Sequence, residues 1–141
     1  MKIEIPLPSI IEQQDAIFEA ATEAGIQQLR ANLDAPRLLG PVDFEESQFQ
    51  RNHLLREHEG WEPPPAEVVD AYFRHFQTAF PDYGTDKKLA RLLGLRGQSA
   101  DRRIREFKAG TYKVPFGVWR YFLVLTGRVP QDIIPVLVFI T

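Results

Sequence analysis

The order of apolar and polar residues predicts helices along most of this chain. After Ser9, apolar residues recur at three-, four-, seven- and eight-residue spacing, which predicts an amphipathic helix over about residues 10–33 with Ser9 as its N-cap. Two prolines and a glycine interrupt the pattern, and further helices are expected over about residues 44–58 and 66–80. The chain is therefore expected to be all-α.

Three more helices are expected close together in the later half of the chain. Thr85 fits the N-cap of the first helix, and Gly94 fits a left-handed stop at its end. Ser99 fits the next N-cap, Gly110 closes that helix, and Pro115 opens a last, strongly apolar helix that should form the centre of the core. The residues expected to face inward are Val69, Tyr72, Phe73, Phe76, Phe80, Leu89, Ala90, Leu93, Ala100, Ile104, Phe107, Val118, Trp119, Phe122 and Leu125.

The two ends of the chain have a different pattern from the helices. Ile3 and Ile5 alternate with polar neighbours, as in an edge strand, and residues 133–141 are rich in β-branched and aromatic residues. The two ends are expected to form a small sheet or to exchange strands between protomers. The alternative is that the apolar tail residues pack back onto their own domain; these are Ile134, Val136, Val138 and Ile140.

The triple proline at residues 63–65 is the best candidate for a boundary within the chain. It separates an acidic N-terminal helical region, residues 1–63, from a helical bundle over residues 64–128, and an apolar tail follows over residues 129–141. A chain of 141 residues with 44% hydrophobic and 26% charged content is long enough for one compact domain with an appendage.

The composition excludes several classes of chemistry. The chain has no cysteine, which excludes disulfides, thiolate metal sites and a cysteine nucleophile. Its first residues resemble neither a signal peptide nor a transit peptide, and its most apolar run is too short to span a bilayer. We therefore expect a cytoplasmic protein.

Positive charge is concentrated in one segment of an otherwise acidic chain. Residues 85–128 hold 11 of the 17 Lys and Arg residues but only 3 of the 19 Asp and Glu residues, although the whole chain has a net charge of −2. A segregated basic segment is typical of a nucleic-acid-binding surface, because each neutralised phosphate releases counterions. The alternative is a solvated face that pairs with the acidic part of the chain.

The stretch TDKKLARLLGL, followed by IREFKAGTYKVP and an apolar helix, resembles the lambda-repressor-like (XRE-type) helix-turn-helix family. That family has a Leu-Ala pair, a Leu-Gly-apolar stop, an apolar-x-x-aromatic recognition helix and a closing glycine near a proline. The residues that occupy these places are Leu89, Ala90, Leu93, Gly94, Leu95, Ile104, Phe107, Gly110 and Pro115. The resemblance covers about residues 66–127. The segment between Leu95 and Ile104 is longer than usual in the family, which leaves open where the recognition helix begins.

The resemblance implies that the helix after Ser99 lies in the major groove of double-stranded DNA. A helical wheel places Arg102, Arg105, Glu106 and Ala109 on its outward face. The residues expected to contact bases are Gln98, Ser99, Arg102 and Arg103. The residues expected to contact phosphates are Thr85, Lys87, Arg105, Lys108, Lys113 and Arg120. The chain is thus predicted to be a sequence-specific transcriptional regulator, associated with the nucleoid when bound to DNA and acting as a homodimer, since one helix-turn-helix contacts only a few base pairs.

Two other classes of function are weighed against DNA binding. His53 and Glu57 stand four residues apart, as two metal ligands can, but no third ligand is evident, and a solvated helix end is the preferred interpretation. No phosphate-binding loop or nucleophile elbow is present, so neither an enzyme nor a cofactor is expected. A protein-interaction adaptor built on the same fold stays open, with the acidic N-terminal region serving in dimerisation, in docking to a protein partner, or in covering the basic face.

Overall fold

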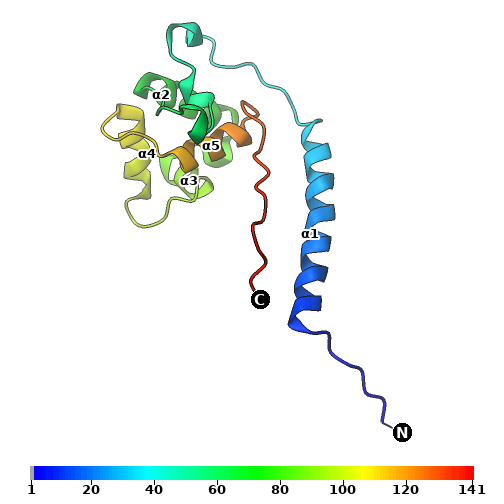
Figure 1. Ribbon diagram of the computed structural model, residues 1–141. Coiled ribbons are helices and arrows are strands. Elements are labelled where there is room, and N and C mark those ends of the chain that lie inside the picture. The colour runs from blue at the N-terminus through cyan, green and yellow to red at the C-terminus, as the bar shows by residue number, and fades with distance from the viewer. Residues whose placement is uncertain (1) are drawn as a thin grey trace. The chain divides into compact units, whose positions relative to one another are not determined.

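The computed structural model describes residues 2–141, and over these residues the protein is all-helical (Figure 1). The α-helices are α1 (Ile10–Asn32), α2 (Ala66–Ala79), α3 (Asp86–Leu92), α4 (Ala100–Ala109) and α5 (Phe116–Leu125). The short 3-10 helices are η1 (Glu46–Gln48), η2 (Asn52–Leu54), η3 (Glu57–Glu59) and η4 (Pro81–Tyr83).

The chain folds as two units. Unit 1 combines the two ends, residues 1–38 and 133–141, and unit 2 is the continuous segment 39–132. Residues 44–61, which the proline boundary had grouped with the N-terminal region, pack against the core of unit 2 through Phe44, Phe49, Leu54 and Trp61.

Unit 1 consists of α1, the residues that flank it and residues 133–141, called the tail below. The tail predicted over residues 129–141 began too early, because Val129 lies in the core of unit 2 and Asp132 pairs with Arg120.

Ser9 caps α1 as predicted, and the capping box is complete: its hydroxyl accepts the Glu12 N–H at 3.1 Å, and its own N–H donates to Glu12 Oε2 at 3.2 Å. No residue of α1 is buried. The small sheet predicted between the two ends is absent from the single chain, because no strand is present in residues 2–141 and the tail is an open chain without backbone pairing (Figure 1). The exchange of strands between protomers stays a prediction.

Unit 2 is a helical bundle whose centre is the aromatic core around α5. Trp119 and Phe122 of α5 and Phe73 of α2 are fully buried, and their rings lie 4.9–5.8 Å apart. The prediction that α5 forms the central element is confirmed. Phe80 and Leu125 were predicted to be buried, but both are exposed. Phe80 is the C-cap of α2 and Leu125 is the last residue of α5, so each lies beyond the part of its helix that packs on the core.

The single helix predicted over residues 44–58 is wrong. The segment instead forms the three 3-10 turns η1, η2 and η3, separated by extended residues. The physical reason is long-range: Arg120 donates to the carbonyl of Leu54, and His53 accepts a hydrogen bond from Trp119. These contacts hold the segment against the core. In a continuous helix the Leu54 carbonyl would instead accept a backbone N–H from the next turn.

The ends of α3 and α4 follow the predicted glycine pattern. Gly94 and Gly110 have φ angles of +80° and +81°, in the left-handed region that glycine adopts without strain. The N–H of the residue after each glycine returns to a carbonyl five residues back, Leu95 to Ala90 at 2.9 Å and Thr111 to Glu106 at 3.0 Å. A side chain at position 110 would also meet the Cβ of Ala66 at 2.9 Å, so glycine is required there on two grounds.

None of the helices within residues 2–141 combines the length and the apolar character that crossing a bilayer requires.

Candidate nucleic-acid interface

The candidate interface is formed by α3, the connection over residues 93–99, and α4. Helix α4 packs on both α3 and α2. It buries Ala100, Ile104 and Phe107, which recur at three- and four-residue spacing, and leaves its opposite face in solvent. The apolar spacing of the sequence therefore positions a polar, cation-rich helical face on the outside of the bundle.

The four residues predicted to contact bases gather at the N-terminal end of α4. Gln98 and Ser99 directly precede the helix, Arg102 and Arg103 lie in its first turn, and all four are exposed. Ser99 stands at the N-cap position as predicted, but its side chain makes no capping hydrogen bond. Its hydroxyl is thus available to a ligand.

Two arginines on α4 form ion pairs within the helix. Arg102 Nε lies 2.9 Å from Glu106 Oε1, and Arg105 Nη1 lies 2.7 Å from Asp101 Oδ2. The hydrogen bond from Arg105 lowers the pKa of the Asp101 carboxyl below its usual value. Both arginines remain largely exposed, and exposed pairs of this kind are weak, so a phosphate or base edge can replace the carboxylate.

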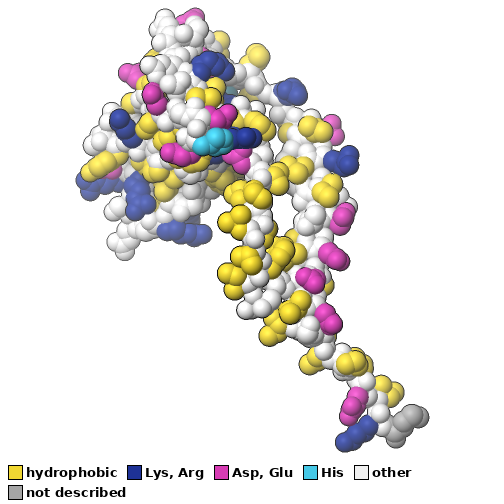
Figure 2. All heavy atoms as spheres, in the orientation of Figure 1, with side chains coloured by type: hydrophobic (Ala, Val, Ile, Leu, Met, Phe, Trp, Pro, Cys, Tyr) yellow, Lys and Arg dark blue, Asp and Glu magenta, His cyan; other side chains and the backbone are white. Residues whose placement is uncertain are grey.

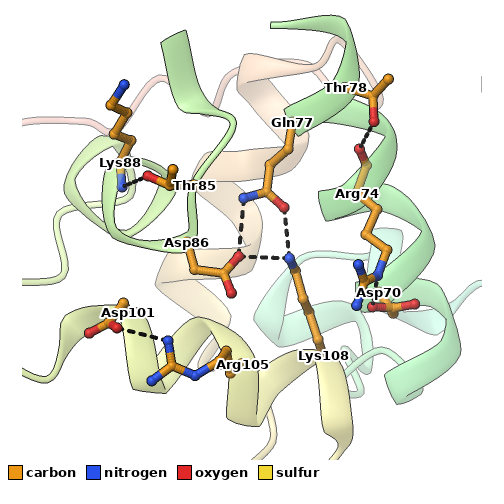
Figure 3. A network of polar contacts seen from close by, with 10 residues as sticks. All are labelled: Asp70, Arg74, Gln77, Thr78, Thr85, Asp86, Lys88, Asp101, Arg105 and Lys108. Carbon is orange, nitrogen blue, oxygen red and sulfur yellow. Dashed lines mark hydrogen bonds and ion pairs between the residues drawn. The ribbon is translucent and has the colours of Figure 1, made fainter. Parts of the chain in front are cut away.

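Lys108 does not fit the phosphate role predicted for it. Its ammonium group lies 2.7 Å from Asp86 Oδ1 and 2.7 Å from Gln77 Oε1, and its side chain is only 9% exposed (Figure 3). Burial raises the pKa of Asp86, but the hydrogen bonds from Lys108 and Gln77 outweigh burial and hold that pKa below its usual value. Lys108 therefore joins α4 to α3 and α2 and is not available to DNA.

Arg120 also turns inward and does not form part of the interface. Its guanidinium group donates to both Asp132 oxygens at 3.1 and 3.3 Å, to the Leu54 carbonyl at 3.2 Å and to the Pro130 carbonyl at 3.4 Å. Four acceptors and a buried side chain make it a structural residue of unit 2. The phosphate role predicted for Arg120 is wrong because α5 lies at the core.

Thr85 and Lys87 lie at the start of α3. The Thr85 hydroxyl accepts the Lys88 N–H at 3.2 Å (Figure 3), which confirms the predicted N-cap. Both Thr85 and Lys87 are exposed. Lys113 is likewise exposed, in the loop that follows α4.

Six exposed cations around α3 and α4 have no acidic partner within residues 2–141. They are Lys87, Lys88, Arg91, Arg96, Arg103 and Lys113. In Figure 2, dark blue side chains gather over the part of the bundle where Figure 1 places α3 and α4. The sequence interpretation missed Lys88, Arg91 and Arg96. The positions of Lys88 and Arg91 relative to the buried pair Leu89 and Ala90 already indicate that they face outward.

His53 is not the solvated helix end that the sequence suggested. It is buried, and its Nδ1 accepts the indole N–H of Trp119 at 3.1 Å. Burial, assisted by Arg51 and Arg128, lowers its pKa from 6.5 to about 4. Over residues 2–141 no three His, Cys, Asp or Glu side chains gather in a group that could hold a metal ion.

An open hollow of about 610 Å³ lies beside the Lys108 network. Its lining residues are Asp70, Arg74, Gln77, Gly84, Asp86, Arg105, Lys108 and Ala109. The charged groups there are already paired, Arg74 with Asp70 at 2.6 Å and Lys108 with Asp86 at 2.7 Å (Figure 3). We assign no ligand to this hollow.

Comparison of the chain with protein-family models, with curated proteins and with solved structures finds no match. The function is therefore argued from the geometry of α3 and α4 and from their charges.

Proposed function

We propose that the protein is a sequence-specific DNA-binding transcriptional regulator in which α3 and α4 act as a helix-turn-helix of the lambda-repressor-like kind. The observation that carries the proposal is the set of six exposed, unpaired cations on and around this helix pair. Buried apolar residues fix the two helices against each other, so these cations are presented on a rigid surface.

In this proposal α4 enters the major groove with its N-terminal end. Arg102 and Arg103 contact base edges there, where an arginine can bind guanine O6 and N7 with two hydrogen bonds. Gln98 and Ser99 take neighbouring edges. The residues assigned to phosphates are Thr85, Lys87, Lys88, Arg91, Arg96, Arg105 and Lys113, and they orient the protein on the duplex without selecting its sequence.

The proposal is tested by selecting bound sequences from a pool of random DNA duplexes and then measuring affinity for the recovered sequence across salt concentrations. We expect one recovered motif and a steep loss of affinity with salt, because the slope of log affinity against log salt is about −0.9 for each phosphate neutralised. An absence of any enriched motif, together with salt-independent binding, would contradict the proposal.

A matched pair of double variants makes this test specific to the interface. Replacing Arg91 and Arg96 by glutamine removes two charges from the proposed surface, and replacing Arg30 and Arg37 by glutamine removes two exposed charges from unit 1. The first change should flatten the salt slope by about 2, whereas the second should leave it unchanged. Equal effects of the two changes would show that net charge alone governs binding.

A protein-interaction adaptor is a second candidate function, favoured by the large apolar side chains that unit 1 exposes. An adaptor of this kind would not bind DNA and would recover no motif, so the selection experiment distinguishes the two candidates. For the regulator we further propose a cytoplasmic protein that joins the nucleoid on binding DNA and acts as a homodimer on two half-sites.

A further inference from the structure

Unit 1 has a large apolar surface and no interior of its own. Eighteen of its large apolar side chains are exposed, and none of its described residues is buried. Packing of an amphipathic face usually supplies most of a helix's stability, and large exposed apolar patches on a monomer mark interaction sites. The exposed apolar side chains of unit 1 therefore mark a candidate interaction surface.

The tail covers only one side of α1. Phe139 packs edge-to-face on Phe18 with ring centroids 4.8 Å apart, and Gln14 Nε2 donates to the Ile140 carbonyl at 3.4 Å. Phe18, which contacts the tail, is 44% exposed, whereas Ile10 and Ile17 are 74% and 67% exposed. The side of α1 that carries Ile10 and Ile17 has no cover within the described residues of unit 1.

Charge on α1 is confined to one edge. With successive residues about 100° apart, all charged residues of the helix fall within an arc of roughly 80°. They are Glu12, Asp15, Glu19, Glu23 and Arg30. The opposite half holds Ile10, Ile17, Ala21 and Phe18 and no charged residue, and Figure 2 shows magenta side chains on one edge of α1 and yellow on the other.

We propose that the uncharged half of α1, together with the tail, is a self-association surface whose partner is unit 1 of a second copy of this chain. In a two-fold interface the same surface faces itself, so charges of one sign spread over it would repel each other, and this half of α1 carries no charge. Ten of the exposed large apolar side chains lie on this surface and would form the centre of an interface of about 20–30 residues per partner. They are Ile10, Ile17, Phe18, Ile133, Ile134, Val136, Leu137, Val138, Phe139 and Ile140. The inference deepens the proposed function and rests on it for its purpose, which is to pair two DNA-binding units.

The first experiment measures the mass of the full chain by sedimentation equilibrium without DNA. We expect a dimer at micromolar concentration. Ile17→Glu adds one negative charge to the uncharged half and should weaken the dimer more than about tenfold. Arg30→Gln makes the same one-unit change in net charge on the charged edge and should leave the dimer intact.

The second experiment uses the absence of cysteine from the chain. Ala21 is the middle residue of α1 and lies on the uncharged half, so Ala21→Cys places a single thiol near the two-fold axis of a parallel or a fully overlapping antiparallel pair. A short thiol-specific bifunctional reagent should link two copies of this variant. It should not link two copies of Glu19→Cys, whose thiol lies on the charged edge.

The outcomes separate this inference from the proposed function. A monomeric wild-type chain, or equal cross-linking of Ala21→Cys and Glu19→Cys, overturns the self-association surface even if the chain binds one DNA motif. If Ile17→Glu weakens the dimer but the selection recovers no DNA motif, the self-association surface is supported and the proposed regulator function is overturned.

Discussion

Trp119 donates its indole N–H to Nδ1 of His53 across 3.1 Å, and this hydrogen bond joins the centre of α5 to η2. The imidazole also lies edge-on to Tyr72, with ring centroids 6.0 Å apart. Because Nδ1 must be unprotonated to accept the indole proton, the fold requires a neutral His53. The segment before the triple proline is therefore held on the bundle by a group that titrates.

The free energy of unfolding should decrease as the pH falls from 6.5 to about 4. His53 has a folded-state pKa of about 4 and an ordinary value of 6.5, so the unfolded chain takes up this proton first on acidification. Glu46 raises this pKa, while burial, Arg51 and Arg128 lower it. The full loss is up to about 3 kcal/mol, and urea unfolding at pH 7 and pH 4.5 measures most of it.

His53→Asn is the control for this pH dependence. Its amide oxygen can accept the Trp119 proton from near the position of Nδ1, but it does not titrate. A wild-type protein whose stability changes between the two pH values no more than that of His53→Asn would contradict the assignment.

Trp119→Ala should lower the free energy of unfolding by about 3–5 kcal/mol, because the indole is fully buried among the rings of the core. Thermal unfolding followed by far-ultraviolet circular dichroism measures the loss. Trp61→Phe is the comparison, since Trp61 Nε1 is buried without a hydrogen-bond partner and its removal leaves no acceptor unpaired. An unchanged midpoint for Trp119→Ala would show that the core lies elsewhere.

Lys108→Met should destabilise unit 2 by about 1–3 kcal/mol, because it removes the donor to Gln77 Oε1 and one of the two donors to Asp86 Oδ1, the other being Gln77 Nε2. The salt slope of DNA binding should not change, since Lys108 is inaccessible to phosphate. Urea unfolding and affinity titrations measure these two effects separately. If Lys108→Met has native stability but a reduced salt slope of DNA binding, Lys108 contacts phosphate and the structural assignment is wrong.

Arg103→Ala should cost about 1–3 kcal/mol of binding free energy and relax the preference at one base pair, and Arg102→Ala should do the same at another. Lys113→Ala, also at an exposed position, should weaken binding to all sequences alike. All three proteins should stay folded, which their unfolding midpoints verify. Affinities for duplexes carrying single base-pair changes test the distinction. If all three variants lose the same binding free energy on every duplex, the assignment of base contacts to Arg102 and Arg103 is wrong.

Local signals in the sequence predicted much of the bundle. Thr85 caps α3 and Gly110 closes α4 because a hydroxyl at an N-cap and a glycine at a left-handed stop act over a few residues. The buried positions of α4 followed from spacing alone. The assignment of base contacts to Arg102 and Arg103 came instead from the helix-turn-helix resemblance and stays a prediction, although both side chains are exposed.

The errors lie where distant residues decide. Residues 44–58 have a helix-like composition, so a helix was predicted there. The hydrogen bond between Arg120 and the Leu54 carbonyl joins residues 66 positions apart, and no local sequence pattern predicts it. Lys108 and Arg120 were grouped with the surface cations because charge alone does not show that Asp86 and Asp132 meet them in the fold. The two ends of the chain form no sheet with each other, because alternating residues form a strand only when a neighbouring strand accepts their backbone hydrogen bonds.

The division of the chain into two units has an optical consequence. Both tryptophans, Trp61 and Trp119, and all four tyrosines lie between residues 39 and 132, whereas the aromatic residues of unit 1 are Phe18 and Phe139. Indole fluorescence and absorbance near 280 nm therefore report on the bundle alone. A tryptophan introduced on α1 would therefore add a fluorescence signal that reports on the association of two copies, while the signal from Trp61 and Trp119 of the bundle stays the same.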